Sequence, residues 1–264
     1  MDLGLLINEF IDNDLVVRGL AHPLVFQTPS SQRIDLDGRT AGLKNRRVGG
    51  GGQSTSNFEL FGAVKVTPKN YYRLLQTGQN ALLFPGGVKE VFHGRNQAYE
   101  TLWPEKVDFV RTAARFNATI VPLSAVGMAD SVNILLDRDQ ILSLPVLGDR
   151  ARAFSNNVTA ARFDMTKEDE MFLAPIVAPG LPSRNYFLFG KPISTRHLDP
   201  NDKAGCDLLY MNVQAEMKRG FDAILAAREK DPYKEAPQRI TYELLTGKKA
   251  PTFPIGELDK STDG

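Results

Sequence analysis

The chain has 264 residues, of which 42% are hydrophobic and 24% charged, the composition of an ordinary soluble globular protein. Its 32 basic and 31 acidic residues leave a net charge of +1, which gives no global electrostatic argument for binding to nucleic acid or for strong binding to anionic membranes. Cys206 is the only cysteine, so an intrachain disulfide is excluded, and its thiol is expected to be packed rather than catalytic. No apolar run reaches the roughly 18 residues of a transmembrane helix, and no secretory signal is expected.

The first part of the chain predicts a helix, a strand and a long loop. Helical spacing of apolar residues favours a helix over 3–10, and the β-rich run 15–21 favours a strand that ends at His22-Pro23. Residues 27–57 contain the glycine run 49–52 within polar sequence, and we expect them to form a flexible loop. A short strand at 63–66 and a helix capped by Thr67 are predicted next.

The most informative stretch joins an apolar run to a Pro-Gly-Gly turn and two charged residues. Residues 81–84 are continuously apolar, which is typical of a buried strand. Pro85-Gly86-Gly87 ends this strand, because proline lacks a donor and glycine permits positive φ. Lys89 and Glu90 are then expected at the mouth of a sheet, where ligands bind in open α/β folds. A plain strand-to-loop turn with solvated charges is the alternative.

The rest of the chain alternates helices and strands. Helices are predicted over 105–116 and about 201–230, with a helical turn at 137–142. Strands are predicted at 118–124, 132–136 and 186–193. Residues 148–168 are expected to be irregular, and the residues after 233 to form a polar C-terminal tail. This order predicts an α/β sheet with helices packed on it, in a single domain that spans 1–264.

Several segments, in their order along the chain, resemble one family. The chain is similar to the plant and algal phytyl ester synthases and plastid diacylglycerol acyltransferases, which are related to the type-two diacylglycerol acyltransferases. The resemblance implies a glycerolipid acyltransferase-like fold with helices on both faces of the sheet. The segments that carry it are 17–23 (VRGLAHP), 84–90 (FPGGVKE), 120–124 (IVPLS), 186–193 (YFLFGKPI), 231–233 (DPY), 239–243 (RITYE) and 250–254 (APTFP).

The resemblance implies an O-acyltransferase. Such enzymes move a fatty acyl group from acyl-CoA or acyl-carrier protein to an alcohol such as diacylglycerol or phytol, and no further cofactor is expected. In the family, the histidine of a His-x4-Asp block removes the proton from the acceptor hydroxyl, and the carboxylate orients the imidazole. Asp2 matches the carboxylate of this block, so its histidine is expected to precede Met1. The chain is therefore expected to be truncated at its N-terminus and to lack one strand.

The resemblance also implies which residues form the site. Catalytic roles are expected for Asp2, His93 and Glu90, and for His93 the alternative is a polar residue that lines the site. Lys89 stands where the family has arginine. Lysine keeps the positive charge but lacks the planar guanidinium that makes two parallel hydrogen bonds. His22 is expected to be structural and His197 to be solvated. The residues expected to bind substrate are Phe84, Pro85, Gly86, Gly87, Lys89 and Pro122.

Other functions stay open on the sequence alone. Without the first-block histidine, the chain is alternatively a catalytically inactive fragment that binds acyl lipid. A hydrolase of the same substrates is disfavoured because no Gly-x-Ser-x-Gly elbow occurs, and no Cys/His cluster indicates a metal site.

The expected partners are an acyl thioester, a lipid alcohol and a peripheral membrane surface, and nucleic acid is not among them. The proline-broken apolar run 171–181 is expected to be a buried loop, with an acyl-path lining or a membrane-dipping segment as alternatives. The resemblance implies a chloroplast location, at a plastid membrane or plastoglobule surface. The endoplasmic reticulum or the cytoplasmic side of a membrane is the alternative.

Overall fold

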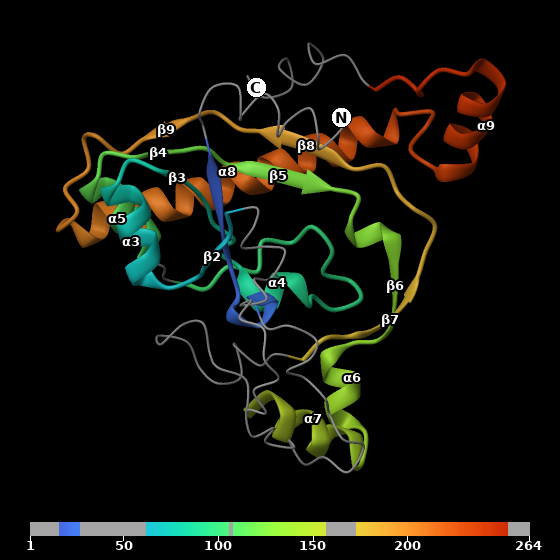
Figure 1. Ribbon diagram of the computed structural model, residues 1–264, viewed down its shortest axis with the longest axis horizontal. Coiled ribbons are helices and arrows are strands. Elements are labelled where there is room, and N and C mark those ends of the chain that lie inside the picture. Colours follow the sequence, from blue (N-terminus) through green and yellow to red (C-terminus); the bar gives the residue numbers. More distant parts are fainter. Residues whose placement is uncertain (1–15, 27–61, 106–107, 157–172, 253–264) are drawn as a thin grey trace, which may run out of the picture. The chain divides into compact units, whose positions relative to one another are not determined.

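The structure is a computed structural model that describes residues 16–26, 62–105, 108–156 and 173–252 (Figure 1). The helix expected at 3–10, the loop expected at 27–57 and the end of the expected C-terminal tail lie outside these residues. The chain divides into two compact units, Met1–Val88 with Leu142–Phe172 and Lys89–Ile141 with Leu173–Gly264. The expected single domain over 1–264 stays a prediction.

The first unit contains a parallel sheet with the strand order β2-β1-β3. Its elements are β1 (Val17–Ala21), η1 (Pro23–Phe26), β2 (Val64–Lys65), α3 (Pro68–Gln76), β3 (Asn80–Leu82) and α7 (Leu147–Asn156). Leu20 of β1 pairs with Val64 of β2, and β1 also pairs with β3. α3 begins as the sequence predicts, because the Thr67 Oγ1 accepts the Asn70 N–H at 3.1 Å, and the helix buries Leu74. The predicted strand-helix-strand order is confirmed.

The second unit is built from antiparallel strand pairs and one long helix. Its elements are α5 (Phe109–Arg115), β4 (Thr119–Ile120), β5 (Leu123–Val126), η3 (Ala129–Ser131), β6 (Val132–Leu136), β7 (Ile176–Pro179), β8 (Tyr186–Phe189), β9 (Ile193–Ser194), α8 (Lys203–Glu229) and α9 (Ala236–Thr246). The pairs are β4 with β9, β5 with β8, and β6 with β7. Two short helices, α4 (Gly87–Val91) and α6 (Arg138–Ser143), cross the boundaries between the units. The predicted mixed α/β class is confirmed, with small sheets in the described ranges.

The core of the second unit lies where α8 packs against β5 and β8 (Figure 1). Val126, Tyr186 and Ile224 form a buried apolar cluster there. α8 comes so close to β5 that the Ser124 Oγ donates a hydrogen bond to the Met217 carbonyl at 3.1 Å. A Cβ atom on Gly220 would lie 2.3 Å from that Ser124 Oγ. Glycine at this helical position is therefore a condition of the close contact.

Aromatic rings join α5 to the first half of α8. The Trp103 ring centroid lies 5.6 Å from that of Tyr210 and 6.2 Å from that of Phe109. Phe109 and Tyr210 are both buried, and the Tyr210 hydroxyl donates to the Pro104 carbonyl at 2.6 Å. Cys206 is also buried in α8, where burial raises the pKa of its thiol, as expected for a packed cysteine.

Three stretches differ from the sequence-based expectation. Residues 148–168 were expected to be irregular, but α7 covers their start, and residues 157–172 lie outside the described ranges. The run 171–181 was expected to be a buried loop, but β7 within it pairs with β6 and leaves Ile176 and Val177 about two-fifths exposed. The polar tail expected after 233 contains α9, which starts with a proline in its first turn and ends at Gly247 with φ +65°.

No helix within the described ranges is long and apolar enough to cross a membrane.

A buried polar cluster around Asp231 closes the C-terminal end of α8. The Tyr186 hydroxyl donates to Asp231 Oδ2 at 2.7 Å, and the Tyr233 N–H donates to Oδ1 at 2.8 Å. The Arg184 Nη1 lies 3.0 Å from Oδ2 and also donates to the Pro251 carbonyl at 2.7 Å. Burial alone would raise the pKa of Asp231, but these hydrogen bonds and the guanidinium outweigh it and lower the pKa. The cluster holds β8 and residues 250–251 to the end of α8.

Replacement of Asp231 by alanine is expected to destabilise the protein by about 3–5 kcal/mol, because it leaves the Arg184 guanidinium and the Tyr186 hydroxyl buried without their partner. Urea unfolding followed by circular dichroism measures this change. Asp222→Asn is the matched control: its carboxylate is 63% exposed and pairs with Lys218 at 3.4 Å, so a change within about 0.5 kcal/mol is expected. Equal losses in both variants would contradict the role given to Asp231.

The lowered pKa of Asp231 also predicts a pH dependence. A carboxylate whose pKa is lower in the folded than in the unfolded chain stabilises the fold above its ordinary pKa, and this contribution is lost as the pH falls through the folded value. The difference in unfolding free energy between wild type and Asp231→Asn should therefore be constant above about pH 4 and shrink below it. The ordinary pKa of an aspartate carboxyl is about 3.8. A free-energy difference that stays constant as the pH falls below this value to pH 3 would contradict this cause.

Candidate active site

The Pro-Gly-Gly segment forms a tight turn between β3 and α4. The Gly87 N–H donates to the Phe84 carbonyl at 3.1 Å, which closes the turn, and Gly87 has φ +56°. A Cβ on Gly87 would meet no atom within 4 Å, so glycine is needed here for its backbone conformation and not for space. The predicted break after the apolar run is confirmed, but the charged residues that follow lie on a short helix and not on a loop.

The turn leaves one aromatic side chain in contact with solvent. Phe84 is 58% exposed, whereas Gly86 is buried. An exposed phenyl ring beside a turn of fixed shape suits contact with an apolar ligand such as an acyl or prenyl chain.

α4 carries the two charged residues of the predicted site. Lys89 is exposed and Glu90 half-buried. The Glu90 Oε1 accepts a hydrogen bond from the Leu102 N–H at 3.1 Å, which ties the helix to the segment 94–105. Glu90 thus positions the segment 94–105 through a hydrogen bond to its backbone.

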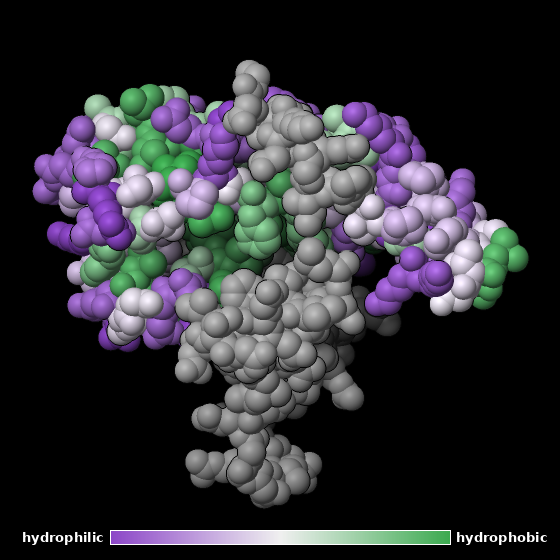
Figure 2. Space-filling model, turned by 90° about the horizontal axis from the view of Figure 1, so that it is seen from above, coloured by the Kyte–Doolittle hydropathy of each residue, from purple (hydrophilic) through white to green (hydrophobic). Residues whose placement is uncertain are grey.

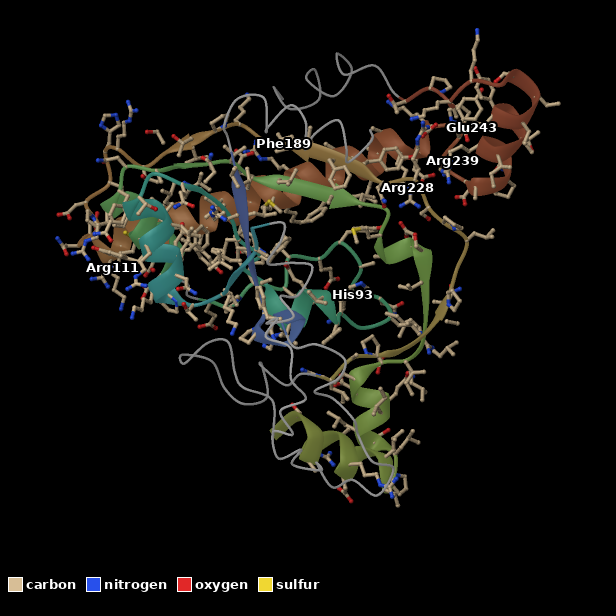
Figure 3. All side chains as sticks on the ribbon, in the orientation of Figure 1. His93, Arg111, Phe189, Arg228, Arg239 and Glu243 are labelled. Atoms are coloured by element: carbon tan, nitrogen blue, oxygen red, sulfur yellow. The ribbon has the colours of Figure 1, made fainter. Side chains whose placement is uncertain are left out.

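His93 follows α4 and is half-buried (Figure 3). Its Nδ1 lies 2.9 Å from the Gly94 carbonyl. A carbonyl oxygen only accepts, so Nδ1 is the donor in this contact, and in the neutral tautomer that makes it Nε2 is the nitrogen without a proton. Among the described residues, the ring has no carboxylate partner. His93 therefore presents a basic nitrogen whose tautomer is fixed by the backbone.

The segment after His93 is held at three points that the sequence did not predict. Besides the bond from Leu102 to Glu90, the Arg95 Nη2 donates to the Leu135 carbonyl of β6 at 2.7 Å. The Tyr99 hydroxyl accepts the Gly127 N–H at 3.0 Å and donates to Asp130.

Asp130 joins this segment to the end of α8, because the Arg228 Nη1 lies 2.6 Å from its carboxylate. Burial, and then the hydrogen bond to Asp130, raise the pKa of Tyr99 to about 12. The phenol therefore stays protonated at physiological pH and keeps its donor. The backbone around His93 is in this way fixed to β6 and α8.

The remaining predicted residues come from other parts of the chain. Pro122 is buried between β4 and β5, where its carbonyl accepts the Gly190 N–H at 2.8 Å, and its substrate-binding role stays a prediction. His22 ends β1 and is half-buried, and burial lowers its pKa, consistent with a structural role. His197 is exposed, as expected. Asp2 lies outside the described residues. Within the described ranges, no group of three His, Cys, Asp or Glu side chains could hold a metal ion.

Comparison with known proteins gives two relatives from Arabidopsis thaliana. The chain is 32% identical over 262 residues to the protein named phytyl ester synthase 1, chloroplastic, across 96% of this chain and 35% of the relative. It is 30% identical over 258 residues to phytyl ester synthase 2, chloroplastic, across 95% of this chain and 34% of the relative. No protein-family model and no solved structure matches the chain.

These matches cover nearly all of the chain and agree with the family that its segments resemble. The chain spans about one third of the length of these relatives. It is a homologue of the phytyl ester synthases over that length, and the resemblance to this family is confirmed.

Proposed function

We propose that the chain is part of an O-acyltransferase that moves a fatty acyl group from an acyl thioester to an alcohol. The observation that carries this proposal is the match of 96% of the chain to a phytyl ester synthase, whose name describes formation of an ester of phytol. Acyl-CoA or acyl-carrier protein is the donor, and phytol or diacylglycerol is the acceptor. Both relatives are named chloroplastic, which supports a chloroplast location at a lipid surface.

His93 is the proposed base of the reaction in the described part of the chain. The acceptor hydroxyl oxygen attacks the thioester carbonyl, a new C–O bond forms, and the C–S bond breaks. The hydroxyl proton passes to the Nε2 of His93 and from there to the departing thiolate, so the products are an ester and a free thiol. Its unprotonated Nε2 and its fixed tautomer support this role.

The other predicted residues take binding and positioning roles in this proposal. Phe84 contacts the hydrocarbon chain, and the Pro85-Gly86-Gly87 turn sets the position of that ring. Lys89 interacts with the phosphate groups that coenzyme A and the carrier's prosthetic arm both contain. Glu90 holds the segment that follows His93 through its bond to Leu102.

A second candidate is a module that binds acyl lipid without turnover. The acceptor that orients the His93 ring is a neutral carbonyl, which stabilises a charged imidazolium less than a carboxylate would. A protein of this kind would retain acyl lipid on purification and release neither ester nor thiol from an acyl thioester.

His93→Gln is expected to lower kcat for acyl transfer at least about a hundredfold, because glutamine has no basic nitrogen. KM for the thioester should change little, since the base acts on the acceptor. Thiol release from acyl-CoA in the presence of phytol measures both constants. His197→Gln, which alters an exposed histidine of the same unit, should behave as wild type. Unchanged kcat in His93→Gln would remove His93 from the mechanism, and bound lipid with no thiol release from wild type would favour the binding module.

Gly87→Ala is expected to destabilise the protein by about 1 kcal/mol, because alanine is strained at positive φ. Gly87→Asn should lose less, since asparagine adopts this conformation more readily. Thermal unfolding measures both changes. Gly19→Ala is the matched control in the same unit, because its Cβ would also meet no atom within 4 Å and its φ is not positive. An asparagine variant no better than the alanine variant would show that side-chain clashes, not backbone conformation, select this glycine.

A further inference from the structure

The end of α9 carries the most exposed large apolar side chains in the described part of the chain. Leu244 is 80% exposed and Leu245 82% exposed, and Ile240, one turn earlier, is 51% exposed. Figure 2 shows apolar side chains gathered at the end of α9, at the right of the view, next to hydrophilic ones. Neighbouring apolar side chains of this exposure are typical of an interaction surface and not of a fold-stabilising contact.

The opposite face of α9 holds the helix in the second unit. Arg239 Nη2 donates to the Pro182 carbonyl at 3.0 Å, and Glu243 Oε1 accepts the Ala250 N–H at 3.1 Å. The Tyr242 and Tyr233 ring centroids are 4.7 Å apart. Figure 3 shows Arg239 and Glu243 near Arg228, at the end of α8. α9 is therefore anchored by one face, while the face with the leucines makes no contribution to this anchoring.

Positive charge follows the apolar face directly. Between Leu244 and Ala250 the charged side chains are Lys248 and Lys249, both exposed and without an acidic partner among the described residues. Glu243 is turned to the inner face by its bond to the Ala250 N–H. Leucines beside lysines at a helix end form the pattern that inserts apolar side chains at a lipid surface while cations meet the phosphate headgroups.

Two other exposed apolar pairs of the second unit fit a lipid surface less well. Ile176 and Val177 of β7 are 43% and 44% exposed, so each is about half buried by its own strand pair. Leu208 and Met211 of α8 are 57% and 56% exposed and lie beside the acidic Asp207. In a second copy of α9 the one acidic side chain, Glu243, would be turned to the inner face by its bond to the Ala250 N–H and away from the two lysines. A surface of anionic lipid offers hydrocarbon to the apolar face and negative charge to the two lysines.

We propose that the end of α9, formed by Ile240, Leu244, Leu245, Lys248 and Lys249, docks on a lipid surface that contains anionic headgroups. This inference rests on the proposed function, because an enzyme whose acceptor and product are long-chain lipids must meet them at such a surface. The leucine side chains enter the boundary of the hydrocarbon region, and the lysine ammonium groups pair with lipid phosphates. α9 thereby fixes the protein at the surface where substrate and product reside.

Vesicle co-sedimentation tests the proposal directly. The full chain is mixed with vesicles of phosphatidylcholine alone or of phosphatidylcholine with phosphatidylglycerol, and the partition coefficient is measured. Wild type should prefer the anionic vesicles. Leu244→Gln with Leu245→Gln, and separately Lys248→Gln with Lys249→Gln, should each lower that partition coefficient at least about tenfold. Leu208→Gln with Met211→Gln, an apolar pair on α8 that is 57% and 56% exposed, should leave it unchanged.

The outcomes separate docking from folding and from catalysis. Circular dichroism and thermal unfolding should show all three variants folded as wild type, because the altered side chains are exposed. Thiol release from a short-chain acyl-CoA with a soluble alcohol should be equal in wild type and the α9 variants. Vesicle binding without any thiol release would overturn the proposed function and leave the docking surface standing. Unchanged partition of the leucine variant, or loss of a dimer on light scattering instead of loss of vesicle binding, would overturn the docking surface.

Discussion

The close contact between α8 and β5 is the constraint on which the second unit depends. Gly220 lets the helix approach until the Ser124 hydroxyl reaches a helix carbonyl, and this approach buries Val126, Tyr186 and Ile224 together. A larger residue at 220 would push α8 away and open that cluster. The length of α8 then matters. Its N-terminal half packs on Phe109 of α5, and Arg228 in its last turn pairs with Asp130 and accepts the Asp231 N–H at its carbonyl.

The candidate base takes its position from this framework through polar contacts. Arg228, in the last turn of α8, binds Asp130, which accepts a hydrogen bond from Tyr99 in the segment that follows His93. Glu90 holds the other end of the same segment through the Leu102 N–H. The loop that begins at His93 is thus tied to the scaffold at Arg95, Tyr99 and Leu102. These contacts link the segment after His93 to the end of α8.

Local patterns in the sequence predicted those elements whose causes are local. The cap at Thr67, the break at Pro85-Gly86-Gly87 and the long helix expected at about 201–230 each depend on residues within a few positions, and all were found. α9 was missed although Pro237 and Gly247 mark its ends. Its apolar residues are largely exposed, so they do not form the buried stripe by which a helix is predicted. β7 was missed because its strand exists only through pairing with β6, which no local pattern reveals. The polar contacts of Asp130 and Asp231 join residues far apart in sequence, so composition and spacing could not have found them.

The product formed from an acyl thioester tests the central claim most directly. The chain is incubated with acyl-CoA and phytol, and mass spectrometry quantifies phytyl ester and free fatty acid in the same sample. An O-acyltransferase gives phytyl ester in amounts equal to the thiol released, with free fatty acid as a minor product. Fatty acid without ester would identify water as the acceptor and contradict acyl transfer to an alcohol. Neither product, with acyl lipid still bound, would contradict catalysis by this chain.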